Sequence, residues 1–169
     1  MKILALDVSS KSTGWFVTKR SCGLIQPPTK LSFEEKLVYF RRELVKLLER
    51  YKPDVAVLED TYFMRNIHTL KALAKFGGVA AEACTAAGCE VVTITATEAR
   101  KYCCGKHEGK FKKEEVFDFF KKRYDLDDWS FEESNDITDA MALLWGYRGL
   151  IKAKNKPAEK KGGKSKKGK

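Results

Sequence analysis

Four acidic residues stand where carboxylates can act together. Asp136 and Asp139 are three residues apart in a segment whose apolar periodicity predicts a helix, so their side chains share one helical face. Asp7 and Glu59 each lie near the end of a short apolar segment that is typical of a buried strand. Acids at the start of a helix also complement the helix dipole, so Asp136 and Asp139 alone do not reveal their role.

The segments that carry Asp7 and Glu59 predict where these two acids lie. Lys2–Val8 and Asp54–Asp60 are the predicted strands, and a capping box at Ser32 and Glu35 starts a helix between them that runs to about Tyr51. A strand, a helix and a second strand usually form a crossover between parallel strands. We therefore expect Asp7 and Glu59 at the same end of one sheet, where ligands of open α/β sheets bind.

Four carboxylates in one place predict a metal site. Without a cation they repel one another, which raises their pKa values, and divalent cations relieve that repulsion. Oxygen ligands without histidine suit Mg²⁺, with Mn²⁺ as a substitute. Two such ions, roughly 4 Å apart, activate a water and stabilise the leaving oxygen of a phosphodiester. The sequence therefore indicates phosphoryl-transfer chemistry at Asp7, Glu59, Asp136 and Asp139.

The remaining segments complete a predicted α/β fold. Short strands at Trp15–Thr18 and Ser21–Gln26 follow the first strand without a helix, as in an antiparallel meander. A helix is predicted over Ile67–Ala87, and Gly77 and Gly78 interrupt it, either to allow close approach to a partner helix or as a kink. The remaining predicted elements are a strand at Cys89–Ile94, a short helix capped by Thr97, a helix over about Lys112–Tyr124, an acidic loop over Asp125–Glu133, and a last helix to about Ile151. We expect a five-stranded mixed sheet flanked by helices.

The charge of the chain is unevenly distributed. The formal net charge is +10, and residues 154–169 contain eight lysines and one glutamate, a net +7, which leaves +3 for residues 1–153. We expect residues 1–153 to form one domain and residues 154–169 to be a disordered tail. The tail either only increases solubility or attracts a polyanion such as nucleic acid in a salt-sensitive manner.

The composition also bears on location. There is no apolar run of 18 residues, and the first acid follows only a few apolar residues, so we expect neither a membrane span nor a signal peptide. Five cysteines without a paired spacing suit a reducing compartment, and the cysteines and the two histidines lack the ligand spacings of a zinc site. We expect a cytoplasmic protein, in the host cytoplasm if it is viral.

Several motifs resemble those of the RuvC-type Holliday junction resolvases, which belong to the RNase H-like nucleases. Asp7 is followed by Gly14 and Trp15, Val57-Leu58-Glu59 resembles the strand that ends in the second acid, and Tyr62 is an aromatic three residues later. The other matching segments are Asn66, Gly78-Val79-Ala80, Lys113-Glu114-Glu115-Val116 and Asp136-Ile137-Thr138-Asp139-Ala140-Met141-Ala142. Val8-Ser9 replaces the Pro-Gly that is common after the first acid in that family.

The resemblance covers about residues 1–150 and implies a function. It implies that Asp7, Glu59, Asp136 and Asp139 bind two metal ions in an RNase H-like fold. It implies a homodimer that makes paired nicks in a four-way DNA junction during recombination and repair. The compact chain and its lysine tail suggest a viral or organellar branch of the family.

Residues around the predicted site are candidates for DNA binding. Lys113, which lies in a matching segment, is the candidate that stabilises transition-state charge, whereas Tyr62 and Phe63 are candidates for stacking on an unpaired base. The candidates for phosphate contacts are Arg65, Lys106, Lys110 and Lys112. Each has an alternative interpretation: the lysines as a solvated basic loop, and the aromatics as half-buried loop residues.

Four hypotheses about function remain open at this point. The first is a metal-dependent endonuclease selective for DNA junctions, either strict for four-way junctions or broader, with activity on forks and flaps. The second is a junction-binding module without catalysis, against which the intact set of acids argues. The third is an enzyme acting on RNA–DNA hybrids, and the fourth is a sugar kinase-like ATPase, for which the chain is short.

Overall fold

The computed structural model describes residues 1–60, 66–104 and 112–155, and the other residues are outside this account. The strands are β1 (Ile3–Asp7), β2 (Thr13–Thr18), β3 (Ser21–Ile25), β4 (Val55–Glu59) and β5 (Glu90–Ile94). The helices are α1 (Phe33–Tyr51), α2 (Ile67–Ala86), α3 (Ala96–Cys104), α4 (Lys113–Tyr124) and α5 (Phe131–Lys154). No helix in these ranges is long and apolar enough to cross a membrane.

The strands form one mixed sheet in the order β3-β2-β1-β4-β5. β1, β2 and β3 form an antiparallel meander, and β4 and β5 continue the sheet parallel to β1. The predicted meander and the predicted parallel crossover are therefore both confirmed. Asp7 and Glu59, the last residues of β1 and β4, lie at the same end of the sheet.

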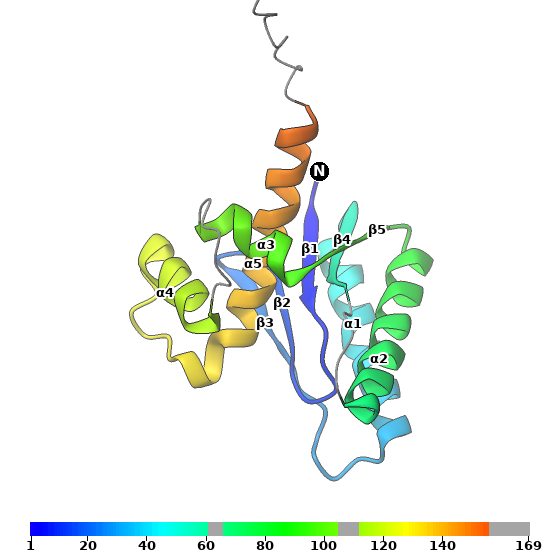
Figure 1. Cartoon of the computed structure of the whole chain (residues 1–169). Coiled ribbons are helices and arrows are strands. Elements are labelled where there is room, and N and C mark those ends of the chain that lie inside the picture. The colour runs from blue at the N-terminus through cyan, green and yellow to red at the C-terminus, as the bar shows by residue number, and fades with distance from the viewer. Residues whose placement is uncertain (61–65, 105–111, 156–169) are drawn as a thin grey trace, which may run out of the picture.

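The two faces of the sheet bury different helices, as Figure 1 shows. Alternate strand residues such as Leu4, Leu6 and Leu58 pack against α1 and α2, and the other set, including Ala5 and Val57, packs against α3, α4 and α5. Side chains alternate between faces along a strand, so Asp7 and Glu59 share the face of Ala5 and Val57. The strand pattern thus directs both acids toward α5.

Several predicted element ends are correct and others are wrong. Ser32 caps α1 through the predicted capping box with Glu35. The N-cap of α3 is wrong: α3 begins at Ala96, and Thr95, rather than Thr97, exchanges hydrogen bonds with Glu98. The interruption of α2 is also wrong, because the helix continues through Gly77 and Gly78. A β-carbon added at either glycine would meet no atom within 4 Å, so neither glycine is needed for packing within the described chain.

The last helix differs most from its prediction. α5 begins at Phe131, so the predicted loop over Asp125–Glu133 ends earlier, and the first-turn acids are Glu132 and Glu133. Asp136 and Asp139 therefore lie inside the helix, which weakens their interpretation as simple complements of the helix dipole. α5 also continues to Lys154, the first residue assigned to the tail, and residues 156–169 lie outside the described ranges.

Candidate active site

Each of the two strand acids is held at its place by the backbone around it. After Asp7 the chain turns back, and the turn is closed by Thr13, which donates its hydroxyl to the Ser9 carbonyl and accepts the Ser9 N–H. This fully buried threonine stabilises the turn that follows Val8 and Ser9. After Glu59 the N–H of Asp60 donates to the Ile94 carbonyl at 2.8 Å, so β5 fixes the end of β4.

Gly14 lets α5 approach the sheet beside Asp7. Gly14 is the antiparallel partner of Asp7, and a β-carbon at Gly14 would lie 2.0 Å from the carbonyl oxygen of Asp136. Any larger side chain here would therefore push the backbone of α5 away from β1 and β2. The spacing between Asp7 and Gly14, which the sequence shows only as a motif, has a packing reason.

Three carboxyl groups meet at this end of the sheet. Burial raises the pKa of Asp7 well above its usual value, and the charges of Asp139 and Glu59 raise it further. A side-chain hydrogen bond with Glu59 also contributes to the raised pKa of Asp7. The predicted convergence of Asp7, Glu59 and Asp139 is present in the structure as mutual electrostatic interaction.

Two cationic side chains contact Asp139. Lys113, the first residue of α4, places its Nζ 2.6 Å from Oδ2, and Arg100 of α3 places Nη2 3.4 Å from Oδ1. Partial burial lowers the pKa of Lys113, but the charges of Asp139, Asp7 and Asp136 outweigh that effect, so its pKa is raised. Lys113 is thus within the field of three of the four predicted acids.

Arg100 is the residue that the sequence analysis missed. Its position depends on the close packing of α3 against α5, where a β-carbon at Gly146 would lie 2.5 Å from the Cα of Ala99. Arg100, Asp139 and Glu59 also line a hollow whose volume is about 10 Å³, close to that of one water. In the sequence Arg100 is only a basic residue in a short predicted helix, and because such residues are common on protein surfaces, the sequence does not indicate its role.

The chemistry of this donor set fits a hard divalent cation. Its candidate ligands are carboxylate oxygens, and after burial the charges of Asp139 and Glu59 are the next causes that raise the pKa of Asp7. Within residues 1–60, 66–104 and 112–155, however, no three Asp, Glu, His or Cys side chains already stand as a group that holds an ion. The two carboxylate oxygens of Asp139 instead contact cations, Oδ2 contacting Lys113 and Oδ1 contacting Arg100.

Of the six predicted DNA-binding residues, Lys112 lies within the described part of the chain. Tyr62, Phe63, Arg65, Lys106 and Lys110 lie outside the described residues. Lys112 is exposed directly before α4, and its N–H donates to Glu115, which fixes the start of that helix beside Lys113. These six assignments remain predictions.

Comparison with known proteins identifies the family. The model of the family described as crossover junction endodeoxyribonuclease RuvC matches residues 3–145. This chain belongs to the RuvC family. The family consists of metal-dependent nucleases, which agrees with the carboxylate cluster.

Relatives match over most of their length. The RuvC of Lawsonia intracellularis is 27% identical over 153 residues, which cover 85% of this chain and 90% of the relative. The RuvC of Thermomicrobium roseum is 28% identical over 154 residues, which cover 87% of this chain and 92% of the relative. The alignments therefore span nearly the whole described fold.

Solved structures share the fold. Thermus thermophilus RuvC in complex with a Holliday junction substrate has a TM-score of 0.77 at 16% identity, covering 91% of this chain and 96% of the other. The yeast mitochondrial Holliday junction resolvase Ydc2 has a TM-score of 0.65 at 12% identity, covering 90% of this chain and 80% of the other. The predicted RNase H-like architecture is therefore confirmed.

Proposed function

We propose that this RuvC-family endonuclease resolves four-way DNA junctions by paired phosphodiester nicks that leave ligatable ends. The observation that carries the proposal is the meeting of Asp7, Glu59 and Asp139 at one end of the sheet, where their charges act on one another. A protein that only binds DNA gains nothing from carboxylates that face phosphates. In a metal-dependent nuclease, by contrast, those carboxylates would bind the metal ions that catalysis requires.

The proposed cofactor is Mg²⁺, with Mn²⁺ as a substitute and two ions at each site. Asp7, Glu59, Asp136 and Asp139 are the proposed ligands. When bound, the ions supply an activated water and stabilise the oxygen that leaves phosphorus. A bound divalent cation would favour the ionised form of Asp7, whose pKa burial raises in the metal-free protein.

The other charged residues of the site have proposed roles of their own. Lys113 reaches the cluster from the first turn of α4 and is placed to balance charge on a phosphate near the four acids. Arg100 orients Asp139 by contacting Oδ1, so we assign it a positioning role. Phosphoryl transfer depends mainly on such positioning and charge balance.

A homodimer is the proposed assembly. Paired nicks need two active sites, and the two strands to be cut are related by the symmetry of the four-way junction. Two copies related by a twofold axis would supply both sites with one interface. We propose that Tyr62, Phe63, Arg65, Lys106, Lys110 and Lys112 contact the branched DNA. Since the proposed substrate is DNA, we also propose that the protein acts inside the cell, in the cytoplasm.

A cleavage panel tests the proposed function. The purified full-length protein is incubated in Mg²⁺ with a four-way junction, a replication fork, a flap, a linear duplex and an RNA–DNA hybrid, and Asp7→Asn serves as the inactive control. We expect symmetric nicks in the four-way junction that ligase can reseal, and none with Asp7→Asn. Equal cleavage of forks and flaps would indicate a broader branched-DNA nuclease, and binding without cleavage of any substrate would contradict catalysis.

A further inference from the structure

Lys113 reaches the acidic cluster through Asp139. Its Nζ lies 2.6 Å from Oδ2 of Asp139, and the charges of Asp7 and Asp136 act on it as well. These three acids are proposed metal ligands, so the ammonium group stands among the side chains that a divalent cation would need. A divalent cation bound to that oxygen would be repelled by the ammonium group at such a short distance, so the two positive charges compete for Asp139.

The two cations on Asp139 are held differently. The side chain of Arg100 is 20% exposed, whereas that of Lys113 is 48% exposed. Arg100 belongs to α3, which packs closely on α5 at Ala99 and Gly146, but Lys113 is the first residue of α4. Lys113 can therefore move its ammonium group into solvent by rotating its own side chain, while Arg100 is confined by the packing around it.

We propose that Lys113 is an exchangeable counter-ion: it neutralises the cluster in the metal-free protein and leaves Oδ2 of Asp139 when a divalent cation is bound, while Arg100 stays on Oδ1. This inference rests on the proposed metal-dependent nuclease function. It explains why the acids are close enough to affect one another but are not gathered as a group that holds an ion. The lysine that is released then becomes available to a DNA phosphate.

The exchange gives Lys113 two opposing effects on the enzyme. In the absence of DNA it competes with the metal, so its removal should strengthen metal binding. In the presence of DNA it balances phosphate charge, so its removal should weaken cleavage. A lysine that only stabilises the fold or only contacts DNA would not strengthen metal binding when it is removed.

Manganese binding without DNA tests the exchange. Free Mn²⁺ is measured by electron paramagnetic resonance during titration of the full-length wild type, Lys113→Met, Lys113→Arg and Asp139→Asn. The matched control is Lys122→Met, which removes an exposed lysine from the same helix. We expect Lys113→Met to bind Mn²⁺ about tenfold more tightly, Lys113→Arg to remain near the wild type, and Lys122→Met to change little.

The outcomes separate this inference from the proposed function. If Asp139→Asn weakens Mn²⁺ binding but Lys113→Met binds no more tightly than the wild type, the exchange is wrong and the metal site stands. If Asp139→Asn binds Mn²⁺ as tightly as the wild type does, the proposed metal site itself is wrong.

A second measurement follows Lys113 of the wild type itself. Side-chain Nζ–Cε correlation spectra are recorded with and without Mg²⁺, and the Lys113 signal is assigned by its absence in Lys113→Arg. We expect the signal to move toward the position of exposed lysines as Mg²⁺ is added. A Lys113 signal that does not move at saturating Mg²⁺ would overturn the exchange.

Discussion

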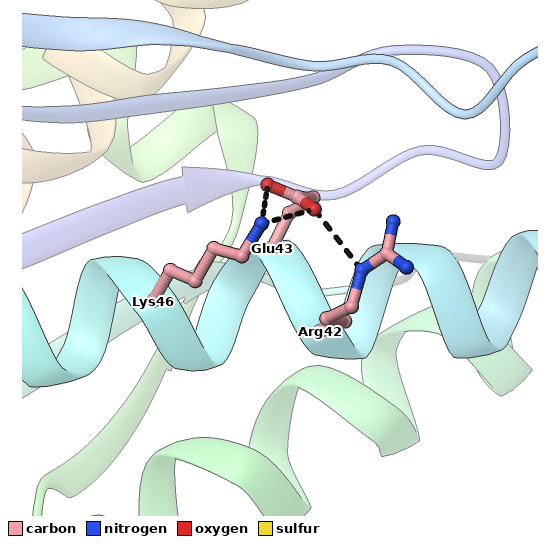
Figure 2. Close-up of polar contacts among 3 residues, drawn as sticks. All are labelled: Arg42, Glu43 and Lys46. Atoms are coloured by element: carbon pink, nitrogen blue, oxygen red, sulfur yellow. Dashed lines mark hydrogen bonds and ion pairs between the residues drawn. The ribbon is translucent and has the colours of Figure 1, made fainter.

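Glu43 on α1 and Asp139 on α5 each contact two cationic side chains. Glu43 accepts hydrogen bonds from Lys46 at 2.8 Å and from Arg42 at 3.2 Å, as Figure 2 shows. Asp139 contacts Lys113 at 2.6 Å and Arg100 at 3.4 Å. The distances are similar, so geometry alone does not separate the two clusters.

The two clusters differ in their burial and in the charges around them. In the α1 cluster the hydrogen bond from Lys46 lowers the pKa of Glu43, as expected for one acid between two bases near water. At the end of the sheet, burial and the neighbouring acids raise the pKa of Asp7. Exposed pairs such as those of Glu43 typically contribute only about 0.2–1 kcal/mol. A crowded, partly buried set of acids instead destabilises the fold and is retained where it serves function.

The largest expected difference is in catalysis. Asp139→Asn removes a proposed metal ligand and should lower junction cleavage by on the order of a thousandfold. The matched variant Glu43→Gln breaks the α1 cluster and should leave the cleavage rate within about twofold. Both rates are measured under single-turnover conditions with a labelled four-way junction. Full activity in Asp139→Asn would remove Asp139 from the site.

Two glycines provide the next contrast, this time in stability. Gly14→Ala forces a β-carbon against the carbonyl of Asp136 and should lower the free energy of unfolding by about 1–3 kcal/mol and reduce cleavage. Gly77→Ala adds a methyl group to open space within a helix and should raise that free energy by about 0.5–1 kcal/mol. Urea denaturation measures both. A destabilised Gly77→Ala would indicate a partner packed against α2.

The two clusters should also depend on pH in opposite directions. The folded-state pKa of Asp7 is raised above 3.8, so its favourable contribution is complete below that pH and is lost as the pH rises through the folded-state pKa. The pKa of Glu43 is lowered from 4.5, so its contribution is present above that pH and is lost as the pH falls.

Thermal denaturation without divalent ions tests this opposition. Asp7→Asn should raise the melting temperature at pH 7 by a few degrees, and the gain should vanish toward pH 3 to 4. Glu43→Gln should lower the melting temperature slightly at pH 7 and not at low pH. A melting temperature of Asp7→Asn below that of the wild type at pH 7 would contradict the inferred cost of the buried acid.

The smallest expected effect concerns the lysine tail. Deletion of residues 156–169 removes seven lysines and one glutamate, a net +6, and leaves α5 complete. Junction affinity should fall at low salt, with a shallower dependence on salt concentration and the same cleavage positions. Fluorescence anisotropy over a range of salt concentrations measures this. An unchanged salt dependence would show that the tail does not contact DNA.

The sequence alone was sufficient for the parts of this protein that depend on local patterns. Ser32 and Glu35 specify the start of α1 within four residues, and apolar segments ending in Asp7 and Glu59 specify two strands. A helix between those strands implies a parallel crossover, because the right-handed βαβ connection has few alternatives. The convergence of two acids and the fold class follow from that connection.

Tertiary structure alone decided how the acids are balanced. Arg100 and Asp139 are 39 positions apart, and their contact exists because Gly146 lets α3 approach α5. Likewise, Gly14 brings the backbone of Asp136 against β2, and Lys113 reaches three acids from the start of another helix. Such contacts depend on the summed packing of several elements, and no local pattern encodes that sum. The sequence determined which residues could perform the chemistry, and packing determined which cations stand beside them.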